Sequence, residues 1–118
     1  MEDEFFILTD LDAALRDGGF DVLSASSGSE ALRLIEAQGP SIRAIVTDVH
    51  LGTGPSGWDV ANFARTQNAA MPIVYASGGN EAEWAVHGVP KSVFVAKPFA
   101  PAQVVVAVSA LLNDAGQV

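Results

Sequence analysis

The sequence predicts an α/β domain in which a parallel sheet is covered by helices on both faces. Three observations support this fold class. The chain has 118 residues, 49% of them hydrophobic and 17% charged, as in one ordinary globular domain. Short apolar runs rich in β-branched residues alternate with stretches of helical periodicity. Polar residues that can carry chemistry stand where the apolar runs end. Because ligands bind at the carboxyl ends of strands in such sheets, the alternation also predicts where a site lies.

Composition excludes several classes of protein. The chain has no cysteine, so it holds no disulfide, no thiolate metal site and no cysteine nucleophile. Its formal net charge of −8 argues against direct binding to nucleic acid, because an acidic surface repels phosphate. No apolar run approaches the roughly 20 residues that a membrane span needs. We therefore expect a cytoplasmic protein that binds neither nucleic acid nor membrane.

The amino-terminal part of the chain shows helical periodicity. Leucines spaced at i, i+3 and i+7 predict a helix over residues 5–16. These leucines are Leu8, Leu11 and Leu15. The pair Gly18-Gly19 would end the helix. An alternating run over residues 20–25 then predicts a strand near a sheet edge.

The rest of the chain continues the alternation. Ser27 and Glu30 form a Ser-x-x-Glu capping box, which predicts the start of a helix that Gly39-Pro40 would end. The remaining predicted elements are strands over residues 43–49, 72–76 and 93–96, a glycine-rich loop over residues 51–57, helices over residues 58–66 and 81–86, and a helix that begins at Pro101. Strands and helices in this order predict βαβ units with right-handed crossovers.

Chemistry-bearing residues collect at one edge of the predicted sheet. Asp48, Ser77 and Lys97 each stand at the end of a predicted strand. Glu2 and Asp3 precede the first predicted helix, where the end of a first strand would lie. Taken one at a time, a strand-end aspartate, a Lys-Pro pair and a serine before glycines are common turn residues. Their combination at successive strand ends predicts a site.

This set of residues suits phosphoryl transfer assisted by a metal ion. Clustered carboxylates repel one another, so a cation is expected among them. Oxygen ligands of this kind suit Mg²⁺. Asp48 would accept the phosphoryl group, Lys97 would supply a second positive charge, and the Ser77 hydroxyl would hydrogen-bond a phosphoryl oxygen.

Four motifs carry a resemblance that covers nearly the whole chain. They are Glu2-Asp3-Glu4, the AIVTDV run that contains Asp48, the IVYASG run that contains Ser77, and the FVAKPF run that contains Lys97. In this order and spacing the sequence resembles the receiver domains of bacterial two-component response regulators. The resemblance implies a flavodoxin-like, five-stranded sheet in the order 2-1-3-4-5.

The resemblance also implies roles for individual residues. A histidine kinase or a phosphotransfer protein would donate the phosphoryl group to Asp48. Mg²⁺ would be held by Glu2, Asp3, Asp48 and the backbone carbonyl of His50. Lys97 would contact the phosphate. Ser77 and Phe94 would form the switch, with Ser77 moving toward the phosphoryl group and the Phe94 ring changing rotamer.

The sequence departs from the family pattern at its start and in one loop. The hydrophobic strand that normally leads into the acidic pair is absent before Glu2 and Asp3, so we expect the first strand to be truncated. Loss of this central strand would remove hydrogen bonds and core on both of its sides. The loop over residues 51–57 is also glycine-rich and one residue longer than the common form.

We expect a receiver domain over residues 1–112 and a short tail over residues 113–118. The domain would signal through contacts with an unidentified downstream protein, or as a homodimer. It would be no enzyme, beyond catalysing its own phosphorylation and dephosphorylation. Three alternatives stay open: a pseudo-receiver that binds proteins without phosphorylation, a hydrolase with Asp48 as nucleophile, and a flavin-binding flavodoxin. The last two are less favoured, since His50 replaces the second aspartate of such hydrolases and no phosphate loop follows a first strand.

Overall fold

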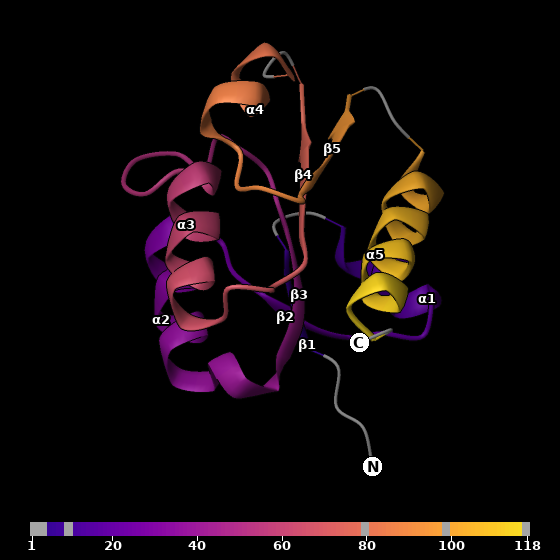
Figure 1. Cartoon of the computed structure of the whole chain (residues 1–118). Coiled ribbons are helices and arrows are strands. Elements are labelled where there is room, and N and C mark those ends of the chain that lie inside the picture. The colour runs from indigo at the N-terminus through magenta and orange to yellow at the C-terminus, as the bar shows by residue number, and fades with distance from the viewer. Residues whose placement is uncertain (1–4, 9–10, 79–80, 98–99, 117–118) are drawn as a thin grey trace.

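The computed structural model describes residues 5–8, 11–78, 81–97 and 100–116 (Figure 1). Strands and helices alternate along the chain, as the sequence predicts. The strands are β1 (Phe5–Leu8), β2 (Asp21–Ser24), β3 (Ile42–Thr47), β4 (Ile73–Ser77) and β5 (Val93–Ala96). The helices are α1 (Asp12–Asp17), α2 (Gly28–Gln38), α3 (Gly57–Gln67), α4 (Glu81–His87) and α5 (Pro101–Gly116), with a 3₁₀ turn, η1, at Gly39–Ser41.

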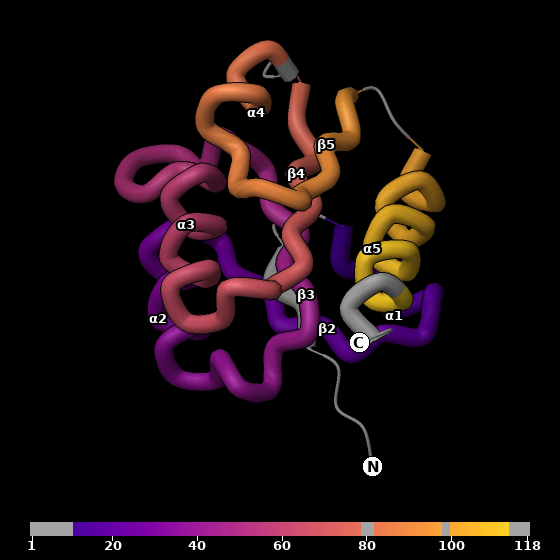
Figure 2. Tube along the Cα trace, in the orientation of Figure 1, coloured from indigo at the N-terminus to yellow at the C-terminus, as the bar shows by residue number. Residues whose placement is uncertain are grey.

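The five strands form one parallel sheet in the order β2-β1-β3-β4-β5, so the predicted sheet order is confirmed. Helices α2 and α3 cover one face of the sheet, and α1 and α5 cover the other (Figure 1). The tube of Figure 2 traces the path of the chain through these layers. The strand order places β2 at one edge of the sheet, as predicted. Each face has its own apolar core. Along β4, Ile73 and Tyr75 pack into one core, while Val74 and Ala76 pack into the other.

The amino-terminal prediction is wrong in part. Residues 5–8 form strand β1, not the start of a helix, and β1 pairs with both β2 and β3. The first strand is therefore short, at four residues, but it is present in the sheet. An unbroken apolar run is typical of a parallel strand covered on both faces, and the sequence FFIL is such a run. The leucine spacing misled because Leu8 ends the strand, whereas Leu15 is buried in α1.

The other predicted elements are confirmed to within a few residues at their ends. Gly19 has φ +95°, a conformation that glycine adopts without strain, and it follows the end of α1 as predicted. Helix α5 extends to Gly116, so residues 113–116 continue this helix instead of forming a tail. Within the residues that the structure describes, no helix is long and apolar enough to cross a membrane.

Side-chain caps fix the starts of α2 and α3. The Ser27 hydroxyl accepts the Glu30 backbone N–H at 3.1 Å, as the capping box predicts. The Glu30 carboxylate, however, accepts from the backbone N–H of Ser26 at 2.7 Å, one residue earlier than expected. Ser56 and Asp59 form a complete capping box at α3, which is absent from the predictions above. Such caps satisfy backbone N–H groups that a helix leaves unpaired.

Helix α3 begins in close contact with the end of β3. The Gly57 N–H donates to the Val49 carbonyl at 2.8 Å. A Cβ atom on Gly57 would lie 2.0 Å from the Asp48 carbonyl oxygen, a distance that no real contact allows. Glycine is therefore required here for the helix to approach the strand end that carries Asp48.

We predict that Gly57→Ala lowers the free energy of unfolding by about 1–3 kcal/mol, because the helix must move away from β3. Gly39→Ala is the matched control. A Cβ on Gly39 meets nothing within 4 Å outside its chain neighbours, so alanine forces no element apart. Gly39 is in the right-handed helical region and precedes Pro40, where a Cβ is disfavoured, and this offsets the gain from a stiffer chain, so the free energy of unfolding should change by less than about 1 kcal/mol. Urea unfolding of both variants measures the difference. Equal effects from the two substitutions would contradict the close approach at Gly57.

Candidate functional site

Three of the predicted site residues meet at one edge of the sheet. Asp48 follows the last residue of β3, Ser77 is the last residue of β4, and Lys97 follows the last residue of β5. The three strands are neighbours and run parallel, so their carboxyl ends lie side by side. The prediction that Asp48, Ser77 and Lys97 converge is confirmed.

The carboxylate of Asp48 is held through both of its oxygens. The Ser77 hydroxyl donates to Oδ1 at 2.9 Å, and the Lys97 ammonium donates to Oδ2 at 3.1 Å. The backbone N–H of His50 also donates to Oδ1, at 3.3 Å. The backbones of Lys97 and Ser77 are also connected, because the backbone N–H of Lys97 donates to the backbone carbonyl of Ser77 at 2.9 Å. The backbone thus fixes the two donors relative to each other.

The surroundings favour the ionised form of Asp48. Partial burial raises the pKa of this carboxyl, but the hydrogen bonds from Ser77 and Lys97, the positive charge of Lys97 and the His50 N–H together lower it below its ordinary value. The Asp48 side chain is 19% exposed to solvent and the Lys97 side chain is 42% exposed, so a reactant can reach the pair from solvent. Asp48 therefore presents a positioned and reachable carboxylate, which is the kind of group that can act as a nucleophile.

The predicted acidic pair does not follow a first strand. Glu2 and Asp3 precede β1 in the chain, whereas the prediction placed them at the end of a strand, so its premise is wrong. Glu2 and Asp3 themselves lie outside the described residues. Asp10 comes two residues after β1 and is also outside them. The strand signal that was missed is the apolar run FFIL.

The donor set that the structure describes is incomplete for a metal. Among the described residues, no three His, Asp or Glu side chains lie close enough together to hold a metal ion. Asp48 offers one carboxylate, which suits a hard cation such as Mg²⁺. His50 contacts Asp48 through its backbone, while its side chain is exposed. The role of the His50 carbonyl as a metal ligand stays a prediction.

The loop between β3 and α3 is anchored to helix α2. Gly52 and Gly54 have φ values of +82° and +91°, which explains the glycines of this loop. A Cβ on Gly28, the first residue of α2, would lie 2.1 Å from the Pro55 carbonyl oxygen. The two segments therefore pack backbone against backbone beside the site.

Phe94, the predicted switch aromatic, lies on β5 and is half-buried. Its ring centroid is 5.9 Å from that of Trp84 in α4. Tyr75, which pairs with Phe94 across the β4–β5 register, is fully buried and is not among the predicted site residues. The rotamer change of Phe94 stays a prediction.

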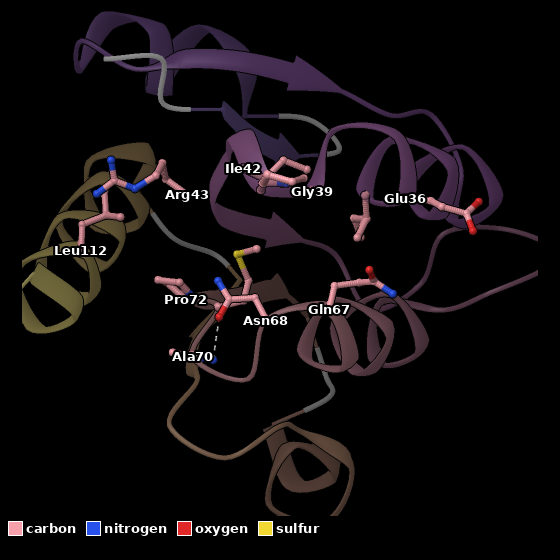
Figure 3. A pocket seen from close by; sticks show the side chains of 12 residues that line it. Glu36, Gly39, Ile42, Arg43, Gln67, Asn68, Ala70, Pro72 and Leu112 are labelled. Carbon is pink, nitrogen blue, oxygen red and sulfur yellow. Dashed lines mark hydrogen bonds between the residues drawn. The ribbon is translucent and has the colours of Figure 1, made fainter. Parts of the chain in front are cut away.

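A hollow of about 570 Å³ lies away from this site (Figure 3). Its lining includes Glu36 of α2 and Gln67 at the end of α3. It also includes Ile42, which begins β3, and Met71, which comes two residues before β4. Ile42 begins β3 and Asp48 follows its end, so the two are roughly 20 Å apart along the strand. The hollow therefore takes no part in the chemistry at Asp48.

Comparison with known proteins agrees with this arrangement. The family model described as "Response regulator receiver domain" matches residues 1–109. The chain is 34% identical over 115 residues to the alkaline phosphatase synthesis transcriptional regulatory protein PhoP of Bacillus subtilis. It is 30% identical over 118 residues to the probable transcriptional regulatory protein TcrX of Mycobacterium tuberculosis. These matches cover 96% and 98% of this chain but only 47% and 49% of the relatives, so the chain spans about half of their length.

Solved structures give the same result. A response regulator receiver protein from Sinorhizobium medicae is 40% identical, with a TM-score of 0.88 and coverage of 94% of both chains. A response regulator receiver domain protein from Clostridium thermocellum has a TM-score of 0.83 over 97% of both chains. At 20% identity, this second likeness concerns the fold alone.

We predict that the Asp48 carboxyl titrates below the ordinary aspartate value of about 3.9, with a midpoint that Lys97→Met raises. Since its pKa is lowered on folding, Asp48 contributes stability above that ordinary value, and this stability is lost as the pH falls through the lowered pKa. Carbon-13 NMR of the carboxyl carbons measures the midpoints. Lys91→Met, which removes an exposed lysine, is the control and should leave the Asp48 midpoint unchanged. Equal midpoints in both variants would contradict the role of Lys97.

Proposed function

Since the chain belongs to the response regulator receiver domain family, we propose that it is a phosphorylation switch in which Asp48 accepts a phosphoryl group. The donor is phosphohistidine on a histidine kinase or a phosphotransfer protein. The observation that carries the proposal is the Asp48 carboxylate, with one oxygen held by Ser77 at the end of β4 and the other by Lys97 directly after β5.

The positions of these groups support a direct transfer. An Asp48 carboxylate oxygen forms a bond to phosphorus as the bond from phosphorus to the histidine nitrogen breaks, and solvent protonates the released imidazole. Lys97 and Ser77 already contact the carboxylate, so they are placed to transfer their hydrogen bonds to phosphoryl oxygens without large movement. Their charge and dipole then stabilise negative charge on the transferring group.

We propose Mg²⁺ as the cofactor. Asp48, the His50 carbonyl and an acidic residue from the start of the chain would hold it, and Asp10 is the preferred candidate because it follows β1 in the sequence. When bound, Mg²⁺ neutralises charge on the phosphate during transfer. Glu2 and Asp3, the acids named by the sequence analysis, are the alternative.

The proposed output is contact with another protein. PhoP and TcrX are transcriptional regulators, and the chain spans about half of their length. We therefore place this domain in the cytoplasm. The response to its phosphorylation would be produced by a partner protein or by another domain. Its own catalysis is limited to its phosphorylation and dephosphorylation.

We predict that Mg²⁺ and acetyl phosphate together add one phosphoryl group to the protein, and that Asp48→Asn abolishes the addition. Asp17→Asn, which removes an exposed carboxylate in α1, is the matched control and should be phosphorylated like the unmodified chain. Ser77→Ala and Lys97→Met should slow the reaction about 10- to 100-fold, since each loses a hydrogen bond to a charged group. Intact-mass spectrometry over time measures the extent and the rate.

No adduct in a folded protein would favour the pseudo-receiver, which binds partners without phosphorylation. An adduct that persists in Asp48→Asn would instead place the acceptor elsewhere.

A second experiment locates the metal ligands. We predict that Asp10→Asn raises the Mg²⁺ concentration needed for half-maximal phosphorylation at least tenfold, whereas Asp3→Asn and Glu2→Gln change it less than twofold. A Mg²⁺ titration of the phosphorylation rate measures this. The opposite ranking would restore the acidic pair at residues 2 and 3.

A further inference from the structure

Tyr75 is a polar residue in the apolar core beside the site. It is the largest of the fully buried side chains, with 0% exposure. It stands on β4 two residues before Ser77, and residues two apart on a strand face the same side of the sheet. The strand that presents a hydroxyl to Asp48 therefore presents a second hydroxyl to the core.

The Tyr75 hydroxyl has a defined partner. It accepts the backbone N–H of Val89 at 3.2 Å, and Val89 lies in the segment that connects α4 with β5. A buried hydroxyl costs free energy unless it is hydrogen-bonded, so a phenylalanine would serve as well if only packing mattered. The contact with Val89 accounts for a tyrosine here.

The same segment is held from α4. The Ser92 hydroxyl donates to the Val89 carbonyl at 2.7 Å and accepts the Trp84 indole N–H at 2.9 Å. Both backbone groups of Val89 are thus bonded, its N–H to β4 through Tyr75 and its carbonyl to α4 through Ser92 and Trp84. Gly88 permits this arrangement, because a Cβ there would lie 2.2 Å from the Trp84 ring.

Aromatic contacts add a second connection between β4 and the end of α4. The ring centroids of Tyr75 and Trp58 are 4.7 Å apart, and those of Trp58 and His87 are 6.0 Å apart. His87 is the last residue of α4. Tyr75 is therefore connected to the end of α4 in two ways. Its hydroxyl accepts from Val89 in the segment after α4, and its ring packs on Trp58, which contacts His87.

We propose that Tyr75 is a positioning residue that couples the state of Asp48 to the position of α4. The proposal rests on the proposed function, in which the Ser77 hydroxyl changes partner when Asp48 is phosphorylated. A shift of Ser77 moves the end of β4, and the hydrogen bond from Val89 to Tyr75 passes this movement to the segment that holds Trp84. This connection is separate from the rotamer change predicted for Phe94.

Tyr75→Phe tests the proposal because it removes the hydroxyl and keeps the ring. In the unphosphorylated protein, the Val89 amide should exchange its hydrogen about two- to tenfold faster, as loss of one hydrogen bond predicts. Thr66→Val is the matched control, since it deletes a hydroxyl that donates to the Phe63 carbonyl in α3. It should leave exchange at Val89 unchanged.

The coupling itself is read from the NMR resonance of the Trp84 indole N–H. In the unmodified protein and in Thr66→Val, phosphorylation should shift this resonance. In Tyr75→Phe, phosphorylated to the same extent by mass spectrometry, we expect the shift to be reduced at least twofold. The remainder would come from the Phe94 ring, whose centroid is 5.9 Å from that of Trp84. An undiminished shift in Tyr75→Phe would overturn the proposal and leave Tyr75 a core residue alone.

Comparing Ser77→Ala with the double variant Ser77→Ala/Tyr75→Phe tests the coupling even in protein that is not phosphorylated. Ser77→Ala disturbs the same end of β4, and the response of Trp84 is compared with and without the Tyr75 hydroxyl. A response that Tyr75→Phe removes supports the coupling even if no phosphoryl adduct forms. No response, or one that Tyr75→Phe leaves intact, overturns it. Failure of the proposed function appears separately, as absence of the adduct.

Discussion

The hydrogen bonds that hold the Asp48 carboxylate depend on the parallel register of β3, β4 and β5. Ser77 and Lys97 are 29 and 49 residues from Asp48 in sequence, so only strand pairing brings them within hydrogen-bond distance. The strands on either side of β4 pair with it along most of its length. A change that displaced β4 or β5 by one residue would therefore remove a donor from Asp48 and turn buried side chains toward the wrong face.

Strand β4 connects the reactive edge with the rest of the molecule. Every residue of β4 is buried, and its side chains contribute to the cores on both faces. Ser77 at its end donates a hydrogen bond to Asp48, while Tyr75 in its interior accepts one from the segment before β5. Because packed interiors transmit displacement instead of absorbing it, this strand is a physically reasonable route from Asp48 to α4.

The sequence predicted the site better than it predicted the amino terminus, for physical reasons. Strands β3, β4 and β5 are apolar runs that end at a chemically distinct residue, so the strand pattern alone places Asp48, Ser77 and Lys97 at one edge of the sheet. Strand β1 has four residues, and a short apolar run beside a helix is ambiguous in periodicity. Because of that ambiguity, the pattern predicts a helix from residue 5 and the end of a first strand at Glu2 and Asp3, whereas β1 follows these two residues in the chain. The hydrogen bond from the Val89 N–H to the Tyr75 hydroxyl could not be predicted, because no pattern in the sequence indicates that these two residues meet.

The central claim is that Asp48 itself carries the phosphoryl group. Reduction of the phosphorylated protein with borohydride converts a phosphorylated aspartate to homoserine, and peptide mass spectrometry locates the modified residue. Our account predicts homoserine in place of Asp48 and at no other aspartate. Homoserine at another position, or a phosphorylated protein that borohydride leaves unchanged, would contradict it.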